Sequence, residues 1–203
     1  MITSRKNPKI QLIKRLVSRY QVRDEERAFV IEGVRLVEEA RDKDWEFRYV
    51  LFCDEVSERG KQLIFRLQDD GFIAEEISQD LMQEISTTET PPGILAVVTK
   101  RVLPMPADMD FCLVLDGIRD PGNMGTILRT AAAMDVQAVF VIPGSVDIYS
   151  PKVVRSAMGA HFRMPIFEVS WEELLSVLLR KDLQPFNFYR TDVRSGKPVW
   201  EVD

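Results

Sequence analysis

The first hundred residues alternate between helix-like and strand-like spacing of apolar positions. Asn7-Pro8 is typical of a helix start, because proline suits the first turn. Apolar residues then recur at helical spacing, at Ile10, Ile13, Leu16, Val17 and Tyr20. Further helices are predicted at 34–43, 56–69 and 79–85, and strands at 28–33, 47–53, 72–77 and 93–100. This alternation favours a small α/β domain.

A second alternation follows an aperiodic stretch with two prolines, 101–110, which is typical of a linker. The strand FCLVLD (111–116) is apolar on both faces, as in a covered parallel sheet. Later strands are predicted at 138–142, 164–169 and 186–191, and helices at 124–135, 151–158 and 171–181. This half is short for a doubly wound domain, so we expect a fragment, or a strand edge that something else covers.

The composition is that of a globular protein, but the charge is uneven. The 203 residues are 45% apolar and 29% charged, with a formal net charge of −5. Residues 1–23 hold no acid and seven cations: Arg5, Lys6, Lys9, Lys14, Arg15, Arg19 and Arg23. Such asymmetry indicates either an anionic partner or simply a solvated helix face.

Cysteine and histidine are too few for a structural zinc site. Cys53 and Cys112 lie far apart in strand patterns, which favours buried free thiols, and His161 is the single histidine. No apolar run reaches membrane-spanning length, and the N-terminus has no signal-peptide core. We therefore expect a cytoplasmic protein with no metal and no membrane partner.

The stretch LDGIRDPGNMGTILRTA (115–131) combines a strand end, a polar turn and a helix start. Ligands of α/β proteins bind where parallel strands end. Pro121-Gly122 suits a type II turn, and Asn123 is a natural N-cap. Arg129 is predicted to point away from the helix core. The residues could also do no more than shape a turn, and no Walker or Rossmann glycine pattern occurs.

This stretch resembles the first signature motif of the SpoU, or TrmH-like, RNA ribose 2′-O-methyltransferases of the SPOUT superfamily, with Asn123, Gly125 and Arg129 at the motif positions. YSPKVVRSAMGAHFRMPI (149–166) resembles the next stretch of that family, and FVIEGVRLVEEA (29–40) resembles its small substrate-binding domain. The GNE-type and Ser-Leu-Asn motifs of the family's trefoil knot are missing from these 203 residues.

The resemblance implies an α/β fold with an RNA substrate-binding domain (1–100), a linker (101–110) and a partial SPOUT-type parallel-sheet methyltransferase domain (111–203). It implies methyl transfer from S-adenosylmethionine to a ribose 2′-hydroxyl of rRNA or tRNA, without a metal. Asn123 and Arg129 are the expected catalytic residues, and Thr191 and Asp192 the expected cofactor contacts. The expected RNA-binding residues are Arg5, Lys6, Lys9, Lys14, Arg35, Lys152 and Arg155.

Two alternatives stay open beside catalysis. Without the knot motifs the chain could be an RNA-binding fragment with no activity, and it would then bind S-adenosylmethionine weakly or not at all. If the motif were a coincidence, the chain would be an α/β domain with an unrelated small-molecule site. We expect a full-length protein of this family to be a homodimer.

Overall fold

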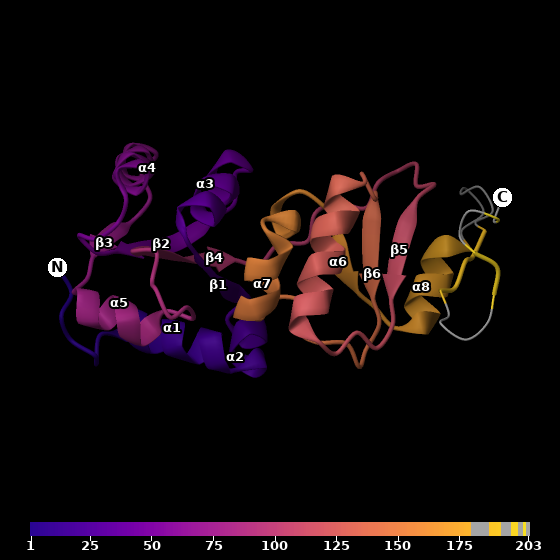
Figure 1. Cartoon of the computed structure of the whole chain (residues 1–203), viewed down its shortest axis with the longest axis horizontal. Coiled ribbons are helices and arrows are strands. Elements are labelled where there is room, and N and C mark those ends of the chain that lie inside the picture. The colour runs from indigo at the N-terminus through magenta and orange to yellow at the C-terminus, as the bar shows by residue number, and fades with distance from the viewer. Residues whose placement is uncertain (180–186, 192–195, 199–200, 202–203) are drawn as a thin grey trace.

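A computed structural model describes residues 1–179, 187–191, 196–198 and 201, and shows two separate sheets (Figure 1). The N-terminal sheet is mixed and has the order β1 (Ala28–Glu32), β4 (Ile94–Thr99), β2 (Phe47–Phe52), β3 (Ala74–Glu76). β4 runs antiparallel to both its neighbours, and β3 runs parallel to β2. The C-terminal sheet is parallel, in the order β5 (Cys112–Leu115), β6 (Ala138–Val141), β7 (Ile166–Glu168).

Helices cover both faces of each sheet. In the N-terminal half, α1 (Pro8–Ser18), α2 (Tyr20–Glu25) and α5 (Gln79–Ile85) lie on one side, and α3 (Val34–Asp42) and α4 (Glu58–Asp69) lie on the other (Figure 1). In the C-terminal half, the core on one side of the sheet includes α6 (Pro121–Ala133), α7 (Pro151–Ala157) and the 3₁₀ turn η1 (Ala160–Phe162). α8 (Trp171–Leu178) packs on the other side. No described helix is both long and apolar enough to cross a membrane.

The two halves share one apolar core, although their sheets are separate. Phe29 of the first half lies against Tyr149 of the second, with ring centroids 4.9 Å apart. Trp45 meets Phe162 edge-on at 5.1 Å. Aromatic pairs in this geometry add to the stabilisation from burial. The halves are therefore packed together and not merely tethered by residues 101–110.

Three local expectations from the sequence were wrong. The first helix does not continue to Tyr20, because Arg19 is extended (φ −129°, ψ 120°) and separates α1 from α2. Residues 187–191 of the expected strand 186–191 are not in a strand, and residue 186 lies outside the described residues. β5 is only half-buried over Cys112–Val114, since it pairs with β6 alone among the described strands.

Candidate active site

The loop after β5 and the start of α6 form the floor of the candidate site. Gly117 has a left-handed backbone (φ 67°), which turns the chain sharply at the strand end. Asp120 is the N-cap of α6, and its side chain accepts a hydrogen bond from the Asn123 backbone N–H at 2.7 Å. Pro121 occupies the first turn, and Gly122 has no left-handed backbone. The expected type II turn and Asn123 cap are therefore wrong, and Asn123 lies inside the first turn with its amide side chain free of any capping role.

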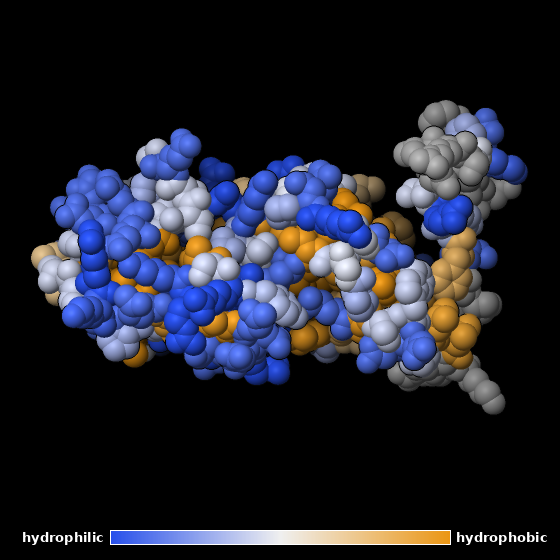
Figure 2. Space-filling view, turned by 90° about the horizontal axis from the view of Figure 1, so that it is seen from below, coloured by the Kyte–Doolittle hydropathy of each residue, from blue (hydrophilic) through white to orange (hydrophobic). Residues whose placement is uncertain are grey.

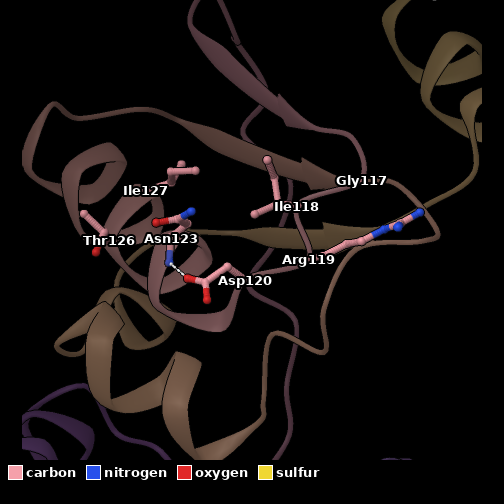
Figure 3. Close-up of a pocket in the computed structure, with 7 residues that line it drawn as sticks. All are labelled: Gly117, Ile118, Arg119, Asp120, Asn123, Thr126 and Ile127. Atoms are coloured by element: carbon pink, nitrogen blue, oxygen red, sulfur yellow. Dashed lines mark hydrogen bonds between the residues drawn. The ribbon is translucent and has the colours of Figure 1, made fainter.

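A solvent-open pocket of about 390 Å³ lies beside this loop, at the carboxyl end of the parallel sheet. Its lining residues are Gly117, Ile118, Arg119, Asp120, Asn123, Thr126 and Ile127. Figure 3 shows the Asn123 amide between Ile127 and the loop, while the Arg119 side chain extends away from the others. The pocket thus offers a mixed apolar and hydrogen-bonding wall that is open to a large partner.

One face of α6 is exposed and polar between Asn123 and Arg129. Asn123, Thr126 and Arg129 follow one another three residues apart on this face, and all are exposed. Arg129 makes no ion pair with any described residue. It lies about 9 Å further along the helix axis than Asn123, so it is beyond the pocket rather than in its lining. An exposed, unpaired guanidinium about one helical turn beyond the pocket residue Thr126 is suited to binding a phosphate.

The small motif residue Gly125 lets α6 approach α7 closely. A Cβ built there would lie 2.4 Å from the Ser156 Cβ and 2.7 Å from the Val153 carbonyl oxygen. Because one of these atoms is backbone, a side chain could not be accommodated without separating the helices. α7 carries the two expected RNA-binding residues Lys152 and Arg155, so this close packing fixes them relative to the motif helix.

Three of the expected RNA-binding cations of the N-terminal segment already have acidic partners. Arg5 and Lys14 pair with Glu84 at 3.0 and 2.6 Å, and Lys9 pairs with Glu75. Lys6 is exposed and makes no ion pair within the described chain. This side of the N-terminal half, which bears α1, α2 and α5, is mainly hydrophilic (Figure 2). Two of the three cations of α1, Lys9 and Lys14, are therefore already paired.

Arg35 lies on α3, Lys152 and Arg155 lie on α7, and all three are exposed. Arg155 donates to the Thr87 hydroxyl at 3.0 Å, so it bridges α7 to the loop before β4. That loop is held by Glu32, whose carboxylate accepts from the Thr87 backbone N–H at 3.0 Å and hydroxyl at 2.8 Å. Neither Arg35 nor Lys152 has an ion-pair partner in the described part of the chain.

The expected cofactor contacts are only partly described. Thr191 is exposed and is not among the pocket residues, and Asp192 lies outside the described residues. A site for a small molecule usually buries most of its ligand. The described residues supply one open wall, which fits one side of such a ligand and does not enclose it.

Sequence reasoning missed Arg119, Glu32 and Thr87. Arg119 lies inside the quoted motif stretch, so its position in the sequence could have identified it as a pocket residue. Glu32 and Thr87 carry no local signal, because their role depends on contacts between residues 55 positions apart. Long-range pairing of this kind cannot be deduced from periodicity.

Comparisons with known proteins fit this architecture. The chain matches the MRM3-like substrate binding domain over residues 7–96 and the SpoU rRNA Methylase family over residues 110–203. It is 31% identical to the 23S rRNA (guanosine(2553)-2′-O)-methyltransferase RlmP of Bacillus subtilis, over 99% of this chain and 77% of that protein. It is 30% identical to an uncharacterized tRNA/rRNA methyltransferase of Synechocystis sp., over 100% of this chain and 73% of the relative.

A solved structure has the same fold. The AdoMet-bound rRNA methyltransferase from Sinorhizobium meliloti superimposes with a TM-score of 0.75 at 28% identity, over 86% of this chain and 66% of that one. The mixed α/β architecture with a parallel C-terminal sheet is therefore confirmed, as is the resemblance that the motif stretch indicated. This chain belongs to the SpoU rRNA methylase family.

Proposed function

We propose that this chain acts in RNA 2′-O-methylation, transferring a methyl group from S-adenosylmethionine to a ribose 2′-hydroxyl of rRNA or tRNA. The observation that carries the proposal is the exposed face of α6, where Asn123 borders the pocket and Arg129 follows without an ion-pair partner. Family membership and the names of the relatives, which are rRNA or tRNA methyltransferases, support the same reaction.

In this mechanism the protein's own groups bind and orient the ribose. A phosphate always lies beside the 2′-hydroxyl, and the planar guanidinium of Arg129 can hold it through two parallel hydrogen bonds. Fixing the nucleotide in an attack geometry lowers the entropic part of the barrier. Because a guanidinium group is a poor general base in proteins, the role assigned to Arg129 is positioning. The Asn123 amide, free of capping, would donate to or accept from the ribose, and bound S-adenosylmethionine supplies the methyl group.

We propose that residues 1–100 form the RNA substrate-binding domain, 101–110 the linker and 111–203 the partial methyltransferase domain. Three observations support this division. The two sheets do not pair with each other, no described helix or strand begins between 101 and 110, and the two family matches end at 96 and begin at 110. The two proposed domains are nevertheless in close contact, because they share one apolar core.

For RNA binding we propose Arg35, Lys152 and Arg155 as the main phosphate contacts. Their exposure and the absence of ion-pair partners for the first two support this assignment. Arg5, Lys6, Lys9 and Lys14 would contribute less, since three of them have acidic partners. We also propose that Thr191 and Asp192 contact the cofactor, that the protein is a homodimer and that it is cytoplasmic.

A second candidate function is RNA binding without catalysis. The observation that favours it is the pocket, which is a single open wall and does not include Thr191. Calorimetry with S-adenosylmethionine separates the two functions. One site per chain with a low-micromolar dissociation constant would support catalysis, while no heat of binding together with retained RNA binding would support the second function.

The catalytic assignment is tested by Arg129→Ala, with Thr130→Ala as its matched control. Both residues are exposed on α6, and the Thr130 hydroxyl only donates back to the Thr126 carbonyl at 2.9 Å. We expect Arg129→Ala to abolish methyl transfer to RNA and Thr130→Ala to retain methyl transfer. Mass spectrometry of the ribose product measures the reaction in both variants. Normal turnover by Arg129→Ala would remove this residue from the mechanism.

A further inference from the structure

A buried ion pair joins the substrate-binding half to the methyltransferase half. Arg23 of α2 donates from Nε to the Asp147 Oδ2 at 2.6 Å, and its Nη2 lies 2.6 Å from the same oxygen. The two side chains are only 6% and 10% exposed. Arg23 also donates to the Leu16 carbonyl and, at 3.3 Å, to the Val17 carbonyl. The guanidinium therefore ties the end of α1 to a residue 124 positions away.

The Asp147 loop is in turn bonded to the floor of the candidate site. The neighbouring Val146 donates its backbone N–H to the Ile118 carbonyl at 2.8 Å. The Ser145 hydroxyl accepts from the Ile118 backbone N–H at 3.2 Å. Ile118 lines the same pocket as Asn123 (Figure 3). A continuous path thus runs from Arg23 through the 145–147 loop to the pocket.

Asp147 is held rigidly at the centre of this path. Its second carboxylate oxygen, Oδ1, accepts from the Tyr149 backbone N–H at 2.9 Å, while Oδ2 faces Arg23. Tyr149 also packs on Phe29 of the first half. Burial of apolar surface is not directional, whereas the two short contacts from Arg23 to Asp147 Oδ2 fix the position of that oxygen.

We infer that Arg23 and Asp147 are a positioning pair, which sets the 116–120 loop of the active site relative to the RNA-binding half. The inference rests on the proposed function, because it assigns the pair the task of aligning bound RNA with Asn123. Neither residue contacts the pocket itself, so both act through Ile118. RNA that contacts the first half would then order the site loop through the same path.

The test compares Asp147→Asn with Glu39→Gln by hydrogen–deuterium exchange. Glu39 is the matched control, because its ion pair with Arg163 at 2.8 Å also crosses between the halves but does not lead to the site loop. Without RNA, we expect the Ile118 and Val146 amides to exchange at least tenfold faster in Asp147→Asn. In Glu39→Gln we expect both amides to exchange at the wild-type rate. The Val139 amide of β6 monitors the fold.

A second variant distinguishes loss of the ion pair from misfolding of Asp147→Asn. Arg23→Met combined with Asp147→Leu removes both charges and leaves apolar side chains, a change that buried ion pairs often tolerate. We expect this double variant to fold and still to show the faster exchange at Ile118 and Val146. Wild-type exchange in this variant, or equal acceleration in Glu39→Gln, would overturn the inference.

The RNA-linked part of the inference is measured by adding bulk tRNA or fragmented bacterial rRNA. In the wild type, RNA should slow exchange over 116–123, and in Asp147→Asn this protection should fall at least fivefold at equal RNA occupancy. Equal protection in both proteins would overturn the coupling. If the wild type bound neither RNA, the proposed function would fail, while the RNA-free comparison would still decide whether the pair positions the loop.

Discussion

His161 is a buried titratable residue at the junction of the two halves, and its protonation should destabilise the fold. Its Nε2 lies 2.7 Å from the Ile148 carbonyl oxygen and so carries the proton, while its buried Nδ1 has no partner. Burial lowers the pKa of His161 from 6.5 to about 4. The neutral form is therefore the folded one, and its stabilisation is complete above pH 6.5 and is lost as the pH falls toward 4.

We expect this titration to remove about 2 kcal/mol of unfolding free energy between pH 7 and pH 5. Urea unfolding at both pH values measures the loss in the wild type and in His161→Gln. The glutamine keeps an N–H donor but does not titrate, so its loss should be smaller by that amount. Equal losses in the two proteins would show that His161 does not contribute to acid sensitivity.

Gly125 is required by packing, because a side chain there would meet the backbone of α7. We expect Gly125→Ala to lower the unfolding free energy by about 1–3 kcal/mol, despite the higher helix propensity of alanine. Gly122→Ala is the control, since its added methyl would meet only the Asp120 carboxylate, at 3.1 Å. Thermal unfolding of both variants compares them, and an undiminished stability of Gly125→Ala would contradict the close helix packing.

At the scale of the element, the start of α6 separates a structural role from a functional one. Asp120 caps the helix, so Asp120→Ala should cost about 1 kcal/mol of unfolding free energy. Asn123→Ala should leave stability almost unchanged, because its side chain caps nothing, yet it should lower methyl transfer. Chemical unfolding and the RNA methylation assay read the two effects separately. A larger stability loss for Asn123→Ala than for Asp120→Ala would restore the capping role predicted from the sequence.

Elements with a strong local signal were predicted to within two residues. The helix 79–85 was predicted with the bounds that α5 has, and the strand 93–100 contains β4. Local periodicity sufficed there, because each element has one apolar face against the core. It failed at Arg19, where the backbone becomes extended although the apolar spacing continues. It also failed at 187–191, whose apolar residues form no strand in the described chain.

At the scale of the whole molecule, the motif predicted the position of the candidate site but not its surroundings. The carboxyl end of β5 could be identified because turn residues follow an apolar strand. The Arg23–Asp147 pair and the Thr87–Arg155 hydrogen bond could not, since they join residues 124 and 68 positions apart. The uneven charge along the sequence could not reveal ion pairs either, for the same reason. Glu75 and Glu84 lie far along the chain and pair with cations of the N-terminal segment.

RNA affinity should therefore depend on unpaired cations more than on α1. We expect Arg35→Ala combined with Lys152→Ala to reduce the slope of log affinity against log salt by about 0.7–0.9 for each phosphate that is no longer bound. Lys9→Ala combined with Lys14→Ala should change the slope less, because these lysines already have acidic partners. Filter binding across a salt series measures both. A larger change from the lysine pair would make α1 the main RNA-binding element.

The shared aromatic core should make the two halves unfold as one unit, although their sheets are separate. Phe162 of the second half packs on Trp45 and on Phe29 of the first, with ring centroids at 5.1 and 6.4 Å. Truncating a buried phenylalanine costs about 3–5 kcal/mol, because apolar burial is reduced and a cavity is left behind. Because that cavity would border both halves, Phe162→Ala should destabilise both sheets together.

Native-state hydrogen exchange of Val97 in β4 and Val139 in β6 reports the two sheets separately. In the wild type we expect both amides to exchange through one global opening with the same free energy, and Phe162→Ala should lower both values equally. Phe167→Ala tests the same expectation at a site away from the junction. Phe167 stacks on Phe140 at 5.5 Å in the core beneath α8, away from the junction. Its truncation should lower both values too, if the cooperative unit includes that core. A fall at Val139 alone in Phe162→Ala would show instead that each half is stable by itself and that the junction contributes little to the folding of the first.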